Sequence, residues 1–329
     1  MDKSKLPELF ERFNQFKILV IGDAMVDSYL WGKVERISPE APVPIVACTK
    51  QENRLGGAAN VALNIQALGA TPILCSVVGH DIKGDLLRDL LRQNSLTDEG
   101  IFADPGRPTT VKTRIISDNQ HLLRVDEEST ENLTPEIELA FTNHILSLVD
   151  HHSVNAIVFE DYDKGAITSE LIRRVVEVAN RKGIPTLVDP KKRNFAAYNG
   201  VTLFKPNYKE LVEGLKLDLK KNDFDGIFQA AKTIHAGMKV NLVFITLSEL
   251  GVFISNGESY NAIPAQMREI ADVSGAGDTV ISTASLCLAA GLAPDAIAAI
   301  ANMAGGLVCE KVGVVPIDKN LLLQECLNA

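Results

Sequence analysis

The run of small residues at positions 272–279, DVSGAGDT, carries the most specific chemistry in the sequence. Gly275, Ala276 and Gly277 allow successive backbone N–H groups to point at one cluster of anionic oxygens, and an apolar helical pattern begins directly after them. Asp278 then stands in the first helical turn, where its carboxylate can accept a proton from an attacking hydroxyl group. The segment indicates a phosphoryl-transfer site with Asp278 as general base; the alternative is an ordinary glycine turn capped by Asp278.

A second glycine pair predicts a place where a ligand approaches the backbone. Gly56 and Gly57 begin the predicted helix LGGAANVA, and Asn60 follows as a polar residue that offers both a donor and an acceptor. We expect these residues to contact sugar hydroxyl groups. The alternative is a helix that packs closely on the sheet.

Three aspartates stand at the ends of apolar runs. Asp23 and Asp27 follow the run at 17–23, and Asp161 ends the run at 156–161. A carboxylate accepts strong hydrogen bonds from hydroxyl groups, so these residues are candidates to bind a polyol substrate. Acidic residues that simply form turns after strands are the alternative.

The segment KPNYKE at 205–210 offers oxygen ligands at the start of a helix. Asn207 and Glu210 can hold water molecules around Mg²⁺, which prefers oxygen ligands and keeps several of its waters. The same Asn-x-x-Glu spacing is also that of a capping box, in which the two side chains satisfy the helix N-terminus.

Short apolar runs separated by helical patterns must position these residues. Helical patterns cover 169–182 and 224–236, and this alternation predicts an α/β fold with helices on both faces of a mostly parallel sheet. The predicted strands are 17–23, 72–79, 156–161, 186–189, 203–204 and 242–247.

Two stretches interrupt this alternation and predict a small β-sheet. Residues 28–49 alternate and carry three prolines, and residues 109–128 read as two strands around the turn at 117–120. We expect these strands to form a lid at the carboxyl edge of the main sheet, where ligands of open α/β sheets bind. With no internal repeat and no long linker, the chain of 329 residues is expected to form a single domain, 1–329.

Composition excludes several classes of partner. The 33 basic and 42 acidic residues give a net charge of −9, which argues against nucleic acid as a partner. No apolar run is long enough for a membrane span, and residues 1–16 lack the pattern of a signal peptide, so we expect a cytoplasmic protein.

The five cysteines are expected to be buried free thiols, without Cys-x-x-Cys pairs.

Together these motifs resemble the ribokinase-like (PfkB) carbohydrate kinases along nearly the whole chain. The segments at 56–60, 207–210 and 272–278 resemble the family's two signatures and its magnesium-linked motif, with Val273 and Ser274 as departures. The resemblance implies a three-layer α/β/α sandwich with a small β lid, and it implies ATP and Mg²⁺ as cofactors. It also implies a set of nucleotide-binding residues: Lys191, Asn207, Thr246, Ser248 (where the family has Gly), Gly251, Gly277 and Asn302.

Within the family, the segments at 22–27, 36–44, 161–165 and 189–191 look like heptose-7-phosphate kinases. This resemblance implies ATP-dependent phosphorylation of the anomeric O1 of D-glycero-β-D-manno-heptose 7-phosphate to the 1,7-bisphosphate, in ADP-heptose synthesis for lipopolysaccharide core. Candidates for holding the 7-phosphate are Arg114, Arg124 and Lys164. Members often carry a nucleotidyltransferase domain, which is not expected here.

Two alternatives stay open for the function: another sugar kinase of this family, acting on a fructose phosphate, ribose or a nucleoside, and a catalytically silent sugar-phosphate sensor. Exposed lid strands present unpaired edges, and the resemblance implies a homodimer through the lid.

Overall fold

The computed structural model describes residues 2–118 and 120–329, and within them the chain forms a nine-stranded sheet and a separate four-stranded sheet. The order of the larger sheet is β13-β12-β11-β10-β9-β8-β1-β4-β5, in which neighbouring strands from β11 to β5 are parallel and β12 is antiparallel to both of its neighbours. Its strands are β1 (Lys17–Gly22), β4 (Thr71–Gly79), β5 (Ile101–Asp104), β8 (Ala156–Glu160), β9 (Thr186–Asp189), β10 (Leu203–Phe204), β11 (Leu242–Thr246), β12 (Val252–Ser255) and β13 (Tyr260–Ile263).

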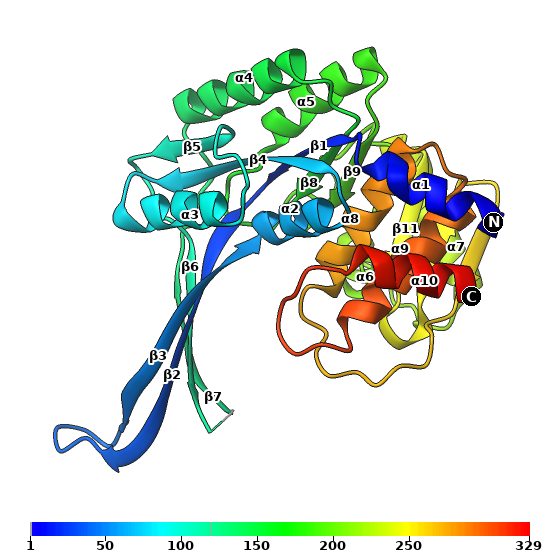
Figure 1. Cartoon of the computed structure of the whole chain (residues 1–329). Helices are drawn as coiled ribbons and strands as arrows, with labels where there is room; N and C mark the ends of the chain where they lie inside the picture. Colours follow the sequence, from blue (N-terminus) through cyan, green and yellow to red (C-terminus); the bar gives the residue numbers. More distant parts are fainter. Residues whose placement is uncertain (1, 119) are drawn as a thin grey trace.

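Helices cover both faces of this sheet because its central strands are apolar on both sides (Figure 1). The core on one face is completed by α1 (Leu6–Phe13), α2 (Ala58–Ala67), α3 (Ile82–Gln93), α8 (Ala276–Ala289), α9 (Pro294–Val308) and α10 (Lys319–Asn328). The core on the other face is completed by α4 (Pro135–His151), α5 (Ser169–Lys182), α6 (Tyr208–Leu215) and α7 (Phe224–Met238). This three-layer α/β/α sandwich confirms the expected fold class.

The smaller sheet is the expected lid, but its first two strands run further than the sequence predicts. Its order is β3-β2-β6-β7, with β2 (Ala24–Ile37), β3 (Pro44–Gly57), β6 (Val111–Ser117) and β7 (Gln120–Glu127). The lid therefore covers 24–57 rather than 28–49, because β2 continues almost directly from β1 and β3 runs directly into α2. The sheet projects from the body as a long arm (Figure 1). Asn119, in the predicted turn, lies outside the described residues.

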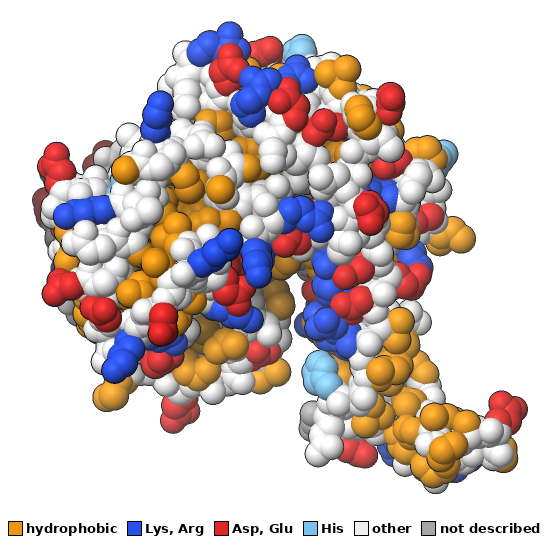
Figure 2. All heavy atoms as spheres, turned by 180° about the vertical axis from the view of Figure 1, so that it is seen from behind, with side chains coloured by type: hydrophobic (Ala, Val, Ile, Leu, Met, Phe, Trp, Pro, Cys, Tyr) orange, Lys and Arg blue, Asp and Glu red, His pale blue; other side chains and the backbone are white. Residues whose placement is uncertain are grey.

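The two faces of the lid differ in chemistry because side chains alternate along a strand and directly paired residues share a face. One face is charged: Asp27 pairs with Arg54 and Lys112, and Tyr29 pairs with Glu52 and Arg114. The opposite face is apolar and includes Leu30, Ile115, Leu123 and Val125. In Figure 2 the arm stands clear of the body, with basic side chains toward the body and apolar side chains toward its far end.

Several local expectations need correction or addition. Cys48 is exposed on β3, contrary to the expectation of buried thiols, because the lid lies outside both cores; the other four cysteines are buried. Short strands β5, β12 and β13 were not predicted. Two 3₁₀ turns, η1 (Lys3–Lys5) and η2 (Ser248–Leu250), complete the elements. Among the described helices, none combines the length and apolar composition that crossing a membrane requires.

Candidate active site

Charged side chains meet at the carboxyl edge of the larger sheet. Parallel register places Gly22 beside Glu160, and Glu160 beside Asp189, at the last positions of β1, β8 and β9. Lys205 directly follows β10, and its Nζ lies 2.7 Å from Asp189 Oδ2. Glu160, Asp189 and Lys205 are all buried. Because ligands of open α/β sheets bind at this edge, the cluster marks the candidate site.

The glycine turn before α8 has the geometry of an anion site. Gly275 has a φ of 78°, in the left-handed region, and α8 begins at Ala276. A Cβ at Gly275 would stand 3.2 Å from both Asn60 Nδ2 and Val314 Cγ1, so the turn has little room for a side chain. The Ala276 N–H donates to the Val273 carbonyl at 3.3 Å, whereas within 2–118 and 120–329 the N–H groups of Gly275 and Gly277 have no protein acceptor.

Asp278 lies in the first turn of α8 with its carboxylate held at both oxygens. Asn60 Nδ2 donates to Oδ2 at 2.6 Å, and the Tyr162 hydroxyl donates to Oδ1 at 3.0 Å. Burial raises the pKa of Asp278 to about 6, although both hydrogen bonds oppose the rise. At neutral pH the carboxylate is mostly ionised and still a useful proton acceptor, which is the property of a general base.

Gly56 and Gly57 end β3 and lead directly into α2, which begins at Ala58 with Gly57 as its N-cap residue. A Cβ on Gly56 would collide with the carboxylate of Asp27, and Gly57 has a φ of 60°. Both glycines are therefore required by close packing against β2 and its neighbours. Asn60, two residues into α2, then reaches Asp278.

Asp23 fixes the loop that carries Tyr162. Its carboxylate accepts hydrogen bonds from the backbone N–H groups of Tyr162, Lys164 and Ala166 at 2.9 to 3.1 Å. Burial nevertheless raises the pKa of Asp23. Asp23 thus sets the position of the hydroxyl that contacts Asp278.

Asp27 and Asp161 have different surroundings. Asp27 lies on the charged face of the lid, where Arg114 Nη1 is 2.5 Å from its Oδ1. Asp161 accepts hydrogen bonds from Asn194 and Tyr198, and Tyr198 belongs to the core on the α4–α5 face. Burial raises the pKa of Asp161 to about 6. Asp161 thus lies beside Asp23, whose charge also raises its pKa, but its own carboxylate is bonded to Asn194 and Tyr198 rather than to the Asp278 group.

Asn207 and Glu210 form a complete capping box at the start of α6. Asn207 Oδ1 accepts from the Glu210 N–H at 2.9 Å, and Glu210 Oε2 accepts from the Asn207 N–H at 2.8 Å. The other carboxylate oxygen of Glu210 accepts from Lys191. Although burial opposes the charged form, the carboxylates of Asp189 and Glu210 raise the pKa of Lys191.

Four of the predicted nucleotide residues lie at the end of β11, in the turn after it and on α9. Thr246 ends β11 and bridges to Asn207, and Gly251 has a φ of 87° with no space for a side chain. Ser248 has a φ of 54°, in the left-handed region that favours glycine. Asn302, on α9, donates to the Pro264 carbonyl at 2.9 Å.

The three cations predicted to bind the phosphate group differ in how many of their nitrogen atoms already donate to carboxylates. Arg124 donates to both carboxylate oxygens of Asp126, each at 2.9 Å. Lys164 Nζ donates to Glu128 at 2.8 Å. Arg114 binds Asp27 through one terminal nitrogen.

Sequence reasoning missed Tyr162, Glu160 and Lys205 as members of this group. Glu160 and Lys205 could have been found from the sequence, because each is an ionisable residue at or directly after the end of a wholly apolar strand. Burial raises the pKa of Glu160 well above its usual range, and the charges of Asp189 and Asp278 raise it further.

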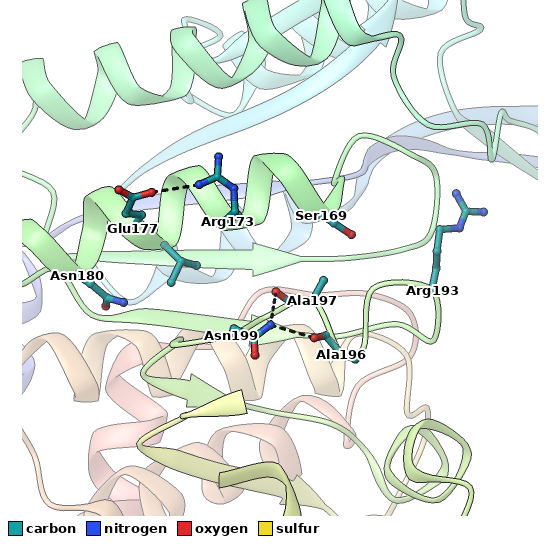
Figure 3. Close-up of a pocket in the computed structure, with 9 residues that line it drawn as sticks. Ser169, Arg173, Glu177, Asn180, Arg193, Ala196, Ala197 and Asn199 are labelled. Carbon is teal, nitrogen blue, oxygen red and sulfur yellow. Dashed lines mark hydrogen bonds and ion pairs between the residues drawn. The ribbon is translucent and has the colours of Figure 1, made fainter. Parts of the chain in front are cut away.

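A hollow of about 640 Å³ lies elsewhere, beside α5 (Figure 3). Arg173 and Glu177 of α5 form an ion pair at its rim, and Arg193, Ala196 and Asn199 line the opposite side. None of the residues in this lining belongs to the predicted site.

Comparison with known proteins finds a matching family model and several curated relatives. The model of the "pfkB family carbohydrate kinase" matches residues 15–320. The "Bifunctional protein HldE" of Geotalea uraniireducens is 39% identical over 99% of this chain and 66% of the relative, and that of Syntrophotalea carbinolica is 38% identical over 97% and 64%. The chain thus spans just under two thirds of the length of these relatives.

Solved structures show the same fold at low identity. Phosphofructokinase-2 from Escherichia coli in complex with potassium has a TM-score of 0.76 at 18% identity, covering 95% of this chain and 98% of that one. Arabidopsis thaliana ribokinase complexed with ribose and ATP has a TM-score of 0.71 at 17% identity, covering 94% and 98%. With the family match over residues 15–320, the chain belongs to the pfkB family of carbohydrate kinases, phosphotransferases that use ATP and act on a sugar hydroxyl group.

Proposed function

We propose that the protein phosphorylates the anomeric O1 of D-glycero-β-D-manno-heptose 7-phosphate with ATP, giving the 1,7-bisphosphate and ADP for ADP-heptose and lipopolysaccharide core synthesis. The single observation that carries the catalytic part is the buried Asp278 carboxylate, held by Asn60 and Tyr162 at the glycine turn. The HldE-named relatives and the subfamily motifs at 22–27, 36–44 and 161–165 support the choice of acceptor.

In the proposed step, a carboxylate oxygen of Asp278 takes the proton of the sugar hydroxyl as the sugar oxygen attacks the γ-phosphorus of ATP. The new O–P bond forms while the bond from the γ-phosphorus to the bridging oxygen breaks, and ADP leaves with that electron pair. The N–H groups of Gly275 and Gly277 stabilise the charge that develops on the γ-phosphoryl oxygens. Lys191, which is paired with Glu210, lies on the proposed nucleotide side.

The residues at 207–210 fit Mg²⁺ bound through water. Asn207 Oδ1 and both carboxylate oxygens of Glu210 already accept protein hydrogen bonds, so their remaining lone pairs suit water molecules better than direct ligation. Within 2–118 and 120–329 no cluster of three or more acidic, His or Cys side chains is placed to hold a metal ion directly. When bound with ATP, Mg²⁺ supplies charge neutralisation on the phosphate oxygens.

The substrate assignment is tested by kcat/KM on a panel of acceptors with ADP release as the readout. We expect the heptose 7-phosphate to exceed fructose 6-phosphate, ribose and a nucleoside by at least about 10-fold, the scale of one well-placed contact. An equal or higher value for fructose 6-phosphate would refute the acceptor. No ATP consumption with any of the sugars would favour the silent sensor.

We further propose a homodimer that forms through the lid. The apolar lid face exposes Leu123 and Val125, which are 57% and 45% exposed, and apolar side chains at the tip extend it. A single layer of sheet with one exposed apolar face needs a partner to cover it, and a second copy of the same face fits by two-fold symmetry.

A further inference from the structure

Glu160 is a buried carboxyl group that the proposed transfer step does not use. It is the last residue of β8, and 1% of its surface is exposed. Its Oε2 atom is buried and has no hydrogen-bond partner among the described residues. In the same part of the chain Glu160 forms no ion pair with Lys191 or Lys205, which bind Glu210 and Asp189 instead. An ionised carboxylate in such surroundings would bear the full cost of losing its water.

Glu160 points toward the start of α8, together with two other ionisable groups. Along β8 the side chains alternate between the two cores, and Glu160 falls on the side of α2 and α8. The same alternation places Asp189, which ends β9, and Lys205, which follows β10, on that side. A Cβ on Gly277 would stand 3.7 Å from Asp189 Oδ2 and 3.9 Å from Lys205 Nζ. The three groups therefore lie between the sheet and the glycine turn.

Asp189 is the acceptor that a protonated Glu160 can reach. The two residues are directly paired between β8 and β9, and neighbouring strands lie about 4.8 Å apart. Asp189 Oδ2 accepts from Lys205 at 2.7 Å, whereas Oδ1 is 3.9 Å from Lys191 Nζ, which is beyond hydrogen-bond distance. Protonated Glu160 would therefore supply a donor next to a carboxylate oxygen that no described residue has bonded.

We propose that Glu160 is a further positioning residue for the transfer step: it carries a proton and donates a hydrogen bond to Asp189, so that Glu160, Asp189 and Lys205 together have no net charge. The inference rests on the proposed function, in which the N–H groups of Gly275 and Gly277 bind the γ-phosphoryl group. With the charges beneath the turn balanced, the positive end of α8 stays available to ATP. Ionised Glu160 would add one uncompensated negative charge there and repel the phosphates.

The groups around Glu160 set the pH at which it loses this proton. The charged and titratable groups that face it come from β9, α8 and the loops after β8, β9 and β10, and they are Asp189, Asp278, Tyr162, Lys191 and Lys205. Burial raises the pKa of Glu160 most, the two carboxylates raise it further, and the two lysines lower it. The net shift is upward, so the proton is lost only as pH rises through the raised pKa. ATP affinity should therefore fall on the alkaline side.

The first measurement is spectroscopic and needs no activity. The infrared difference between the wild type and Glu160→Gln at neutral pH should contain the carbonyl stretch of one protonated carboxyl group. In Asp189→Asn this band should disappear at lower pH than in the wild type, because the negative charge of Asp189 raises the pKa of Glu160. Glu177→Gln, on the exposed side of α5, is the matched control and should not change the band.

The second measurement is the Kd for ATP with Mg²⁺, by calorimetry, between about pH 7 and about pH 9. We expect the wild type and Glu177→Gln to lose about 10-fold in affinity as pH rises, the scale of one unpaired charge near the phosphates. Glu160→Gln carries a neutral group at every pH and should lose less than about 3-fold. The titration of ATP itself is the same for all three proteins.

Absence of the carboxyl band, or an equal alkaline loss of affinity in the wild type and Glu160→Gln, would overturn the proposal. A loss of more than about 10-fold in Glu160→Gln at neutral pH would also overturn it, because the charged form would then be the one that ATP binding needs. Thermal melting separates a folding defect from a binding defect. If the wild type binds no ATP, the proposed function fails and the transfer role of Glu160 with it, whereas the infrared band still decides whether Glu160 carries the proton.

Discussion

Replacing Tyr162 with Phe removes one of the two hydrogen bonds that hold the Asp278 carboxylate, while leaving the ring in place. The hydroxyl lies 3.0 Å from Asp278 Oδ1 and donates to it, so its loss destabilises the ionised form of Asp278 more than the protonated form. The pKa of Asp278, about 6 in the intact site, must therefore rise.

The size of the shift follows from the strength of the bond. A hydrogen bond to a charged group contributes about 1.5 to 3 kcal/mol, and one pKa unit corresponds to about 1.4 kcal/mol, so the expected rise is about 1 to 2 units. The ionised fraction at pH 7 would fall from about nine tenths to between about one half and one tenth. Since a base works only when ionised, activity is lost as pH falls through the pKa, and the variant loses it at higher pH.

The assay is kcat/KM against pH, whose acidic limb reports the free enzyme. We expect the midpoint to move from near 6 to between about 7 and 8. Tyr198→Phe is the matched control, because it removes a buried hydroxyl that donates to a different carboxylate, that of Asp161, and not to Asp278. The phosphate groups of the substrates also titrate near pH 6, but their titration is the same for the wild type, Tyr162→Phe and Tyr198→Phe. A midpoint that stays in place, or that moves equally in the control, would refute this role of Tyr162.

Three further predictions concern the base, a turn and the lid. Asp278→Asn should lower kcat by about 10²-fold or more and leave ATP affinity within about 3-fold by calorimetry, whereas near-normal turnover would remove Asp278 from the role of base. Gly251→Ala should lower Tm by several degrees because the residue has a φ of 87° and its Cβ would meet the Ile263 carbonyl. Gly237→Ala, at a position of α7 with open space around it, should leave Tm unchanged or slightly higher. A larger loss of Tm in Gly237→Ala than in Gly251→Ala would contradict the packing argument. The double variant Leu123→Glu/Val125→Glu should be a monomer where the wild type is the proposed dimer, with the mass measured by light scattering. A mass equal to that of the wild type would argue against the lid interface.

The central elements could be predicted from sequence because each has a strong local pattern. The runs at 17–23 and 186–189 are almost wholly apolar, and the helix at 169–182 has a clear apolar stripe; all three form as expected. Strands β5 and β13 lie at the two edges of the sheet and are only partly buried, so they lack the wholly apolar pattern of the central strands. Strand β12 is fully buried and was missed as well.

The site was only partly predictable. Its motifs are local in sequence, but the hydrogen bonds and ion pairs that join them connect residues that are far apart in the chain. The Asn207–Glu210 pair satisfies its own helix within four residues, so its geometry follows from spacing. The contact of Tyr162 with Asp278 joins residues 116 positions apart and depends on Asp23, which holds the loop. The pairing of Lys205 with Asp189 likewise appears only when β9 and β10 lie side by side.

The buried helix α8 constrains the order in which the chain can mature on the ribosome. Its residues from Asp278 to Cys287 are all buried, and it packs against α2, α9, β8 and β9. Until residues 276–289 have been translated, the sheet has no helix to cover this part of one face, although its described strands have all been made. The nascent polypeptide must therefore expose apolar surface of the sheet until α8 has been made, which is the condition in which chaperones bind a growing chain.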